Sequence, residues 1–168
     1  MKRYRAILSP TRGGPSSRPN QDRVIEIARE NDARLSFLYV TDISFLDRMA
    51  SPVLVDVAQE LDEMGAFVLA MAQERAKAAG VEAEALVRRG DFRSVLQAAI
   101  EEQAIDLVVL GSPVEATGAT TLDYLQSLAG ELNSVCGVAT MILQGGQVVF
   151  QRESGSEAPQ EPCTSEPS

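Results

Sequence analysis

The most constraining feature of the sequence is the segment 106–112, DLVVLGS, in which four consecutive aliphatic residues run into Gly111 and Ser112. An unbroken aliphatic run of this length is typical of a strand that is buried on both faces, in the middle of a parallel sheet. In open α/β sheets, ligands bind at the loops that follow the carboxyl ends of such strands. The loop after Ser112 is therefore a candidate binding loop.

Strand-like and helix-like segments alternate along the chain, which predicts a doubly wound α/β fold, a parallel sheet with helices on both faces. The expected strands lie at residues 5–9, 35–40, 82–88, 107–110 and 138–143. The first expected helix begins near Asn20, a favourable N-cap, and the second begins at the pair Ser51-Pro52. The third follows Gly90-Asp91, and the fourth spans about 121–133.

The helix expected over residues 51–80 carries apolar side chains at spacings of three and four. Such spacing places the side chains on one face of a helix and predicts that they are buried in the core. The residues expected in this buried stripe are Leu54, Val57, Leu61, Met64, Val68 and Met71.

Two glycines, Gly145 and Gly146, separate the fifth expected strand from the apolar run 148–150, which favours a hairpin. We therefore expect 148–150 to form a short extra strand near the edge of the sheet. From Gln151 onward Glu, Ser, Pro and Gly predominate, and this composition does not build a core. The predicted organisation is one domain over residues 1–150 and a disordered acidic tail over 151–168.

Charge and residue content exclude several classes of function. The 168 residues include 15 basic and 24 acidic side chains, a net charge of −9, which argues against non-specific binding to nucleic acid. Without histidine, the chain lacks His-based catalytic triads and every His-containing metal site. Its cysteines, Cys136 and Cys163, form no CxxC pair.

No apolar run has the length of a membrane span or of a signal peptide, so we expect a cytoplasmic location and no membrane partner.

Four segments together resemble the universal stress protein family: Pro10-Thr11 after the first strand, residues 39–42 (YVTD), Gly90-Asp91, and residues 106–112. The resemblance covers roughly residues 3–144. It implies a Rossmann-like, five-stranded parallel sheet in the order 3-2-1-4-5, and a homodimer formed around the fifth strand. In that order strands one and four are neighbours, so the loops 9–17 and 111–121 should face each other across a crevice at the topological switch point.

Family members that bind ATP carry a glycine, two residues, a second glycine, nine residues and then Gly-Ser or Gly-Thr, together with an aspartate after the first strand. Glycines of this kind let the backbone approach phosphates closely. In this chain Gly111 matches the first position, but Val114 stands at the second and Arg12 at the aspartate. The positions that match the binding pattern are Pro10, Thr11, Val40, Gly111, Ser112 and Ser127.

Three interpretations follow from these departures. Val114 would crowd a triphosphate, which favours a member that does not bind ATP in the usual family manner. Alternatively, Arg12 and Gly118 could build a modified phosphate loop for ATP or AMP, because arginine offers a fork of donors that suits phosphate. Third, residues 12–17 (RGGPSS) faintly resemble the Ser-Gly-Gly-x-Asp-Ser loop of the PP-loop ATP pyrophosphatases, which are enzymes, although the leading serine and the acid are missing.

The first interpretation predicts a homodimeric stress-response module that binds or regulates and is not an enzyme. The predicted dimer surface is the edge of the fifth strand, where apolar residues recur: Val138, Met141, Leu143, Val148 and Phe150. An exposed apolar edge has to be covered. Either a second copy pairs with it, or residues 148–150 fold back onto their own chain.

Overall fold

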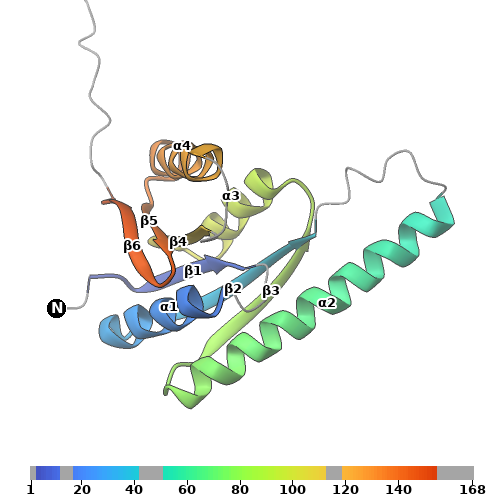
Figure 1. The fold of residues 1–168 in the computed structure, drawn as a ribbon, viewed down its shortest axis with the longest axis horizontal. Coiled ribbons are helices and arrows are strands. Elements are labelled where there is room, and N and C mark those ends of the chain that lie inside the picture. Colours follow the sequence, from blue (N-terminus) through green and yellow to red (C-terminus); the bar gives the residue numbers. More distant parts are fainter. Residues whose placement is uncertain (1–2, 12–16, 42–50, 113–118, 155–168) are drawn as a thin grey trace, which may run out of the picture.

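The computed structural model describes residues 3–11, 17–41, 51–112 and 119–154, with the side chains of 51–56 and 119–121 left out. Within these residues, strands and helices alternate as expected, and a hairpin follows the last helix (Figure 1). The strands are β1 (Ala6–Pro10), β2 (Arg34–Thr41), β3 (Ala83–Arg89), β4 (Leu107–Ser112), β5 (Ala139–Gln144) and β6 (Gln147–Arg152). The helices are α1 (Arg18–Asn31), α2 (Ser51–Ala78), α3 (Phe92–Glu102) and α4 (Ala119–Cys136).

The strands form one sheet in the order β3-β2-β1-β4-β5-β6. The first five are parallel, which confirms the predicted order 3-2-1-4-5, and β6 is antiparallel to β5. β1 lies in the middle, where Ile7 is in register with both Leu35 of β2 and Leu107 of β4. This central position of β1 creates the switch point between the two halves of the sheet.

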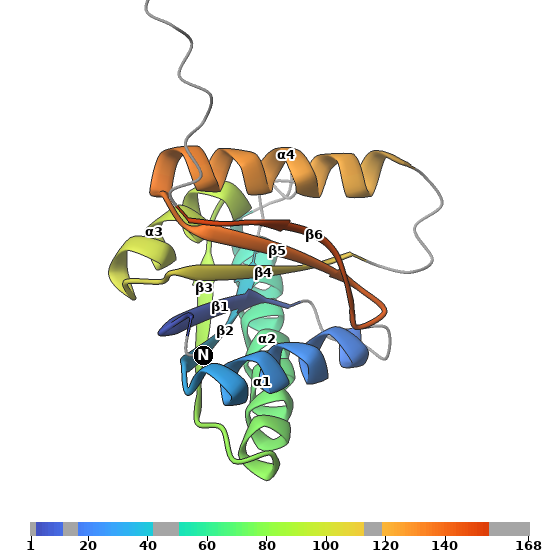
Figure 2. The same ribbon diagram turned by 90° about the vertical axis from the view of Figure 1, so that its left-hand side faces the viewer.

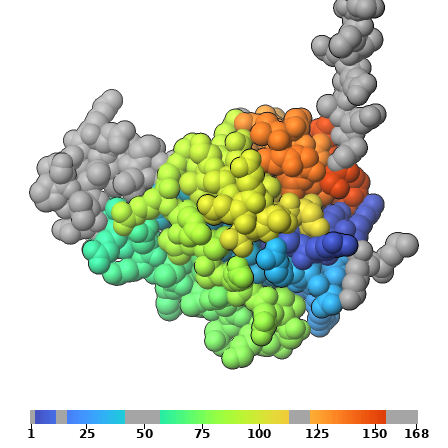
Figure 3. Space-filling model, turned by 180° about the vertical axis from the view of Figure 1, so that it is seen from behind, coloured from blue at the N-terminus to red at the C-terminus, as the bar shows by residue number. Residues whose placement is uncertain are grey.

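Two helices cover each face of the sheet (Figure 2). The buried cluster on the α1–α2 side includes Ile7 and Val109, and the cluster on the α3–α4 side includes Leu8 and Val108. Neighbouring residues of one strand thus enter opposite clusters, as the two-residue period of a strand requires. On the second face α3 lies directly against α4, and the space-filling view from behind shows them in contact (Figure 3).

The predicted start of α1 was wrong. The helix begins at Arg18, with Ser17 in the N-cap position and Pro19 in the first turn. Proline fits there because its missing N–H would have no partner within the helix. Asn20 lies inside the helix and is buried, so its side chain serves the packing of α1 against the sheet instead of capping the helix.

The predicted core face of α2 was also wrong in part. The buried residues are Ala58, Gly65, Leu69, Ala72 and Ala76, whereas Met64 and Met71 are exposed. Gly65 explains the choice of face, because a Cβ there would overlap the ring of Tyr39, so only glycine lets the helix lie this close to β2. Val57, Leu61 and Val68 are half-buried between the two faces, and Leu54 lies among the side chains that are left out.

The predicted hairpin is confirmed, and β6 pairs with β5 of its own chain. Gly145 and Gly146 form its two-residue turn with φ of 58° and 80°, a combination that favours glycine and suits the twist of a hairpin. The register shifts between Ile142 and Leu143, where β6 contains an extra residue. β6 extends to Arg152, so the expected domain boundary at residue 150 falls within the strand; residues 155–168 of the expected tail lie outside the described residues.

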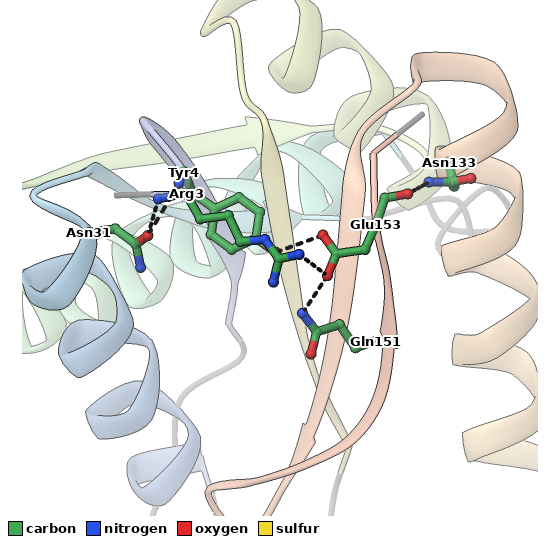
Figure 4. A network of polar contacts seen from close by, with 6 residues as sticks. All are labelled: Arg3, Tyr4, Asn31, Asn133, Gln151 and Glu153. Atoms are coloured by element: carbon green, nitrogen blue, oxygen red, sulfur yellow. Dashed lines mark hydrogen bonds and ion pairs between the residues drawn. The ribbon is translucent and has the colours of Figure 1, made fainter. Parts of the chain in front are cut away.

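A polar cluster, here called the Glu153 network, attaches the end of β6 to the rest of the protein (Figure 4). The Glu153 carboxylate pairs with Arg3 at 3.1 Å and accepts hydrogen bonds from Tyr4 Oη at 3.4 Å and Gln151 Nε2 at 3.1 Å. Asn133 Nδ2 donates to the Glu153 backbone carbonyl at 2.9 Å and to that of Val138 at 3.0 Å. These contacts join β6 to residues 3 and 4 and to α4, so β6 is an integral part of the fold.

Candidate functional site

The carboxyl ends of β1 and β4 lie side by side at the middle of the sheet and carry four of the predicted site residues. Pro10 ends β1 and Thr11 follows it, and Gly111 and Ser112 end β4. Ser112 is buried, Gly111 is exposed, and the Thr11 N–H donates to the Leu38 carbonyl at 2.8 Å. The structure thus brings these four residues to the switch point where the sequence places the crevice.

Asn20, from the first turn of α1, lies against one side of Gly111. A Cβ on Gly111 would lie 3.1 Å from Asn20 Nδ2, so the amide group lies directly against the backbone of β4. The same side chain accepts a hydrogen bond from the Gly146 N–H, at 2.8 Å, in the β5–β6 turn. Asn20 is only 9% exposed and therefore links the end of β4 to the hairpin as a buried polar group.

Gln21, the next residue, makes the corresponding contact with the end of β1. Its Nε2 donates to Thr11 Oγ1 at 2.9 Å, and its Oε1 accepts from Arg75 Nη1 of α2 at 2.7 Å. Arg75 also binds Asp22 and the Arg18 carbonyl, so the guanidinium holds the first turn of α1 in place. Because an arginine only donates, its contact fixes the orientation of the Gln21 amide, with the nitrogen toward Thr11. We call these contacts, with those of Asn20, the Asn20–Gln21 cluster.

The remaining predicted site residues lie in different places. Val40 is half-buried in β2 and packs against the α3–α4 cluster. Ser127 is exposed in the middle of α4 and is not at a helix start, so its N–H takes part in the helix and does not point toward a ligand. Arg12 and Gly118 lie outside the described residues, as do Val114 and most of the segment 12–17.

Asn20, Gln21 and Arg75 are the residues of this site that the sequence alone does not identify. Asn20 and Gln21 are polar residues at positions where the helical pattern of α1 requires burial, one turn before Val24 and Ile25. Buried polar side chains need hydrogen-bond partners. A polar residue at a position that the helical pattern buries is therefore the sequence signal that could have identified Asn20 and Gln21. Their hydrogen-bond partners could not be identified in this way, because they come from three other elements.

A second polar group lies at the carboxyl ends of β2 and β3. Arg89 Nε donates to Asp62 Oδ2 of α2 at 2.7 Å, and this hydrogen bond holds the pKa of the Asp62 carboxyl below its usual value. Thr41, which is buried beside Asp62, lowers that pKa further. Asp91 caps α3 by accepting from the Ser94 N–H at 3.1 Å. Both acids therefore have structural partners.

Other chemistry is sparse in the described part of the chain. No cluster of three or more acidic or cysteine side chains that could hold a metal occurs there. Burial raises the pKa of the Cys136 thiol at the end of α4, which disfavours the reactive thiolate.

An open groove of about 620 Å³ lies between α1 and the hairpin. It is lined by Arg23 with its ion-pair partner Glu26, by Asp22 and by the Gly145–Val148 segment. No helix among the described residues could cross a membrane.

Comparison with known proteins places this geometry in a family. The model of the Universal stress protein family matches residues 3–124, and no curated protein matches. Among solved structures, a universal stress protein family member from Burkholderia pseudomallei is 24% identical, with a TM-score of 0.63, over 84% of this chain and 96% of its own. A universal stress protein in complex with cAMP is 23% identical, with a TM-score of 0.57, over 84% and 98% of the two chains. An Arabidopsis thaliana family protein with AMP bound is 17% identical, with a TM-score of 0.57, over 94% and 97%.

Proposed function

Because the chain belongs to the universal stress protein family, we propose that it is a homodimeric stress-response module that binds or regulates partners and does not bind ATP in the usual family manner. The observation that carries this proposal is the Asn20–Gln21 cluster. A nucleotide site at the switch point needs open space beside the glycine that ends β4, so that phosphates can reach the backbone N–H groups. Here the Asn20 amide lies against one side of Gly111, whose other side is exposed, so it narrows the approach to the backbone of that glycine.

Displacing the cluster has an energetic cost. A ligand that moved Asn20 and Gln21 aside would break their hydrogen bonds to Gly146 and Thr11. Each buried polar group left without a partner costs about 1–3 kcal/mol. The family pattern has a second glycine where this sequence has Val114, and a valine at that position of the pattern would crowd a triphosphate. The absence of histidine from the sequence supports a module without catalytic activity.

A second candidate is a nucleotide-binding member that uses a modified phosphate loop around Arg12 and Gly118. It is favoured by the two structural neighbours described with cAMP and with AMP bound. A monophosphate needs fewer backbone contacts than ATP, so AMP or cAMP fits this alternative better than ATP does.

Thermal denaturation with millimolar ATP, AMP or cyclic AMP, each with magnesium, separates the two candidates. A ligand at about 100 times its Kd stabilises the folded state by about 2.7 kcal/mol, which raises the Tm by several degrees. We expect no rise with ATP. A rise with AMP or cyclic AMP that disappears in Arg12→Ala would favour the modified loop, and a rise with ATP would contradict the proposed function.

For the homodimer, we propose the outer edge of β6 as the pairing surface. The edge of β5 is occupied by β6, and Val138, Met141 and Leu143 are buried within the protomer. β6 is the last strand of the sheet, and Val148 and Val149 in it are each 41% exposed. An edge strand with unpaired backbone groups and exposed valines is suited to pairing with a second copy.

Light scattering at micromolar concentration tests this surface. We expect the mass of a dimer for the natural chain and of a monomer for Val148→Lys, whereas Val135→Lys, at an exposed valine of α4, keeps the dimer. Phe150→Asp should also weaken the dimer, but Phe150 packs against the α3–α4 cluster of its own protomer, so that variant needs a stability measurement beside it. A monomeric natural chain would contradict the proposal.

A further inference from the structure

The outer face of α2 carries an apolar patch that no described element covers. Met64 is 55% exposed, Phe67 is 67% exposed and Met71 is 44% exposed. At 100° per residue these three side chains lie together, directly opposite Leu69 and Ala76, which face the sheet. Figure 1 shows α2 on the outside of the protein, with the sheet on one side of the helix only. Exposed apolar patches of this kind mark interaction sites.

The patch is framed by acidic side chains on the same face. Glu60 is exposed one turn before Met64, Glu63 is exposed one turn before Phe67, and Glu74 is exposed one turn after Met71. Lys77 follows Glu74 toward the end of the helix, and Asp62 is paired with Arg89 of β3. Arg75, one turn after Met71, is paired with Asp22 of α1. The surface therefore combines three large apolar side chains, two of them adaptable methionines, with a mostly negative rim.

We propose that this patch, Met64, Phe67 and Met71 with the rim Glu60, Glu63 and Glu74, is a docking site for a basic amphipathic segment of another protein. Apolar side chains of such a segment would pack on the methionines and Phe67, and its lysines or arginines would lie near the three glutamates. Charge complementarity of this kind selects partners and speeds their association. The net charge of −9 favours a cationic partner in the same way.

Two other occupants have the wrong charge. In an antiparallel pair of α2 helices centred on Phe67, Glu60 of one chain would face Glu74 of the other. In a parallel pair, each glutamate would face the same glutamate of the second chain. Like charges opposite one another disfavour both arrangements. The segment 155–168 of this chain carries Glu157, Glu161 and Glu166, and neither lysine, arginine nor a large apolar residue, so it does not complement the patch either.

Fluorescence anisotropy of a labelled helical peptide built of leucine and lysine, titrated with the full chain, tests the proposal. We expect the peptide to bind, and its glutamate-for-lysine counterpart not to bind. Phe67→Ser should weaken binding at least about tenfold, as expected for a central apolar anchor. Val135→Ser, which removes a 63% exposed apolar side chain from α4, should leave the affinity unchanged. Circular dichroism verifies that each variant is folded.

The rim has its own test. Glu60→Lys combined with Glu63→Lys should weaken binding of the basic peptide severalfold at low salt, and the difference should shrink at high salt because salt screens exposed charges. Glu82→Lys with Glu84→Lys, on exposed positions of the β3 region, changes the net charge equally and serves as the control.

Three results would overturn the proposal. Equal binding of the basic and acidic peptides would show that charge does not select the partner. Unchanged affinity of Phe67→Ser for the basic peptide would show that the peptide does not bind at the patch. A lower molar mass of Phe67→Ser than of the natural chain, by light scattering without peptide, would make a second copy the occupant. None of these results depends on whether the switch point binds a nucleotide.

Discussion

The first and last turns of α1 both attach the helix to the rest of the protein through an asparagine. In the first turn, Asn20 Oδ1 accepts from the Gly146 N–H at 2.8 Å. At the last residue, Asn31 Oδ1 accepts from the N–H groups of Arg3, at 2.8 Å, and Tyr4, at 3.2 Å. The chemistry is the same, but Asn20 is buried at the carboxyl ends of the strands and Asn31 is half-buried at their amino ends.

The two ends of the strands differ in whether a ligand could bind where the asparagine side chain lies. The carboxyl ends of a doubly wound sheet are where ligands bind, so the Asn20–Gln21 cluster occupies potential binding space. The amino ends are not where such sheets bind ligands, and there Asn31 and the Glu153 network hold residues 3 and 4 and β6 against the helices. We therefore expect substitutions at the amino end to change stability alone, and substitutions at the carboxyl end to change stability and access.

The largest effect is expected at the amino end, for Asn133→Ala. The buried Asn133 amide donates to two backbone carbonyls, those of Val138 and Glu153, and the substitution leaves both without this donor. We expect a loss of about 2–3 kcal/mol in the free energy of unfolding, measured by urea denaturation. Ser134→Ala, at the exposed neighbouring position, is the control. Equal stability of the two variants would show that the network does not hold β6.

At the carboxyl end, Gly146→Ala is expected to cost about 1–2 kcal/mol of stability. Gly146 has φ of 80°, and an added Cβ would lie 3.2 Å from the Pro19 carbonyl oxygen. Gly80→Ala is a matched control, because Gly80 has φ of 81° and nothing within 4 Å of an added Cβ. The difference between the two losses in urea denaturation measures the close contact with α1. Equal losses would mean that backbone strain alone accounts for the effect.

The pair Asn20→Ala and Asn31→Ala tests the comparison directly. Each removes hydrogen bonds to backbone N–H groups, and we expect losses of about 1 kcal/mol in both. In thermal denaturation with AMP, only Asn20→Ala should gain a shift relative to the natural chain, because only that substitution opens space beside Gly111. A similar response of both variants to AMP would contradict the role assigned to Asn20.

The smallest effect concerns pH and the Tyr4 hydroxyl. Burial raises the pKa of Tyr4 above its ordinary value, and the nearby Glu153 carboxylate raises it further. A folded-state pKa above the unfolded one means that the neutral phenol contributes stability below about pH 10, which is lost as the pH rises through the folded pKa. Tyr4→Phe should therefore lose less stability than the natural chain as the pH rises above about 10, by chemical denaturation. Parallel pH profiles would contradict this assignment.

Much of the fold could be predicted from the sequence because the signals are local. Aliphatic runs such as 107–110 predict strands, and glycine pairs such as Gly145-Gly146 predict turns, from residues that are neighbours along the chain. The buried face of α2 could not be predicted in this way. Apolar residues occur on two faces of that helix, and the choice between them depends on the fit of Gly65 against Tyr39 of β2.

The candidate site shows the same limit. The sequence places Thr11 and Gly111 at the ends of two neighbouring strands, and in the structure Thr11 directly follows β1 and Gly111 lies near the end of β4. It does not reveal that Asn20, expected to cap a helix, lies against Gly111, because these two residues come from different elements and meet only when α1 packs across the sheet.

By itself, the sequence determined the α/β class, the alternation of elements, the strand order through its family resemblance, and the ends of β1 and β4 as the switch point. These follow from periodicity and from local turn signals, which need no long-range partner. Only the tertiary structure decided that β6 pairs with its own chain, that Asn20 contacts both Gly111 and Gly146, the latter 126 residues away from it, and that Met64, Phe67 and Met71 face outward. The physical reason is that a side chain's partners across a sheet are set by packing between elements, and the sequence pattern of one element is compatible with more than one such packing.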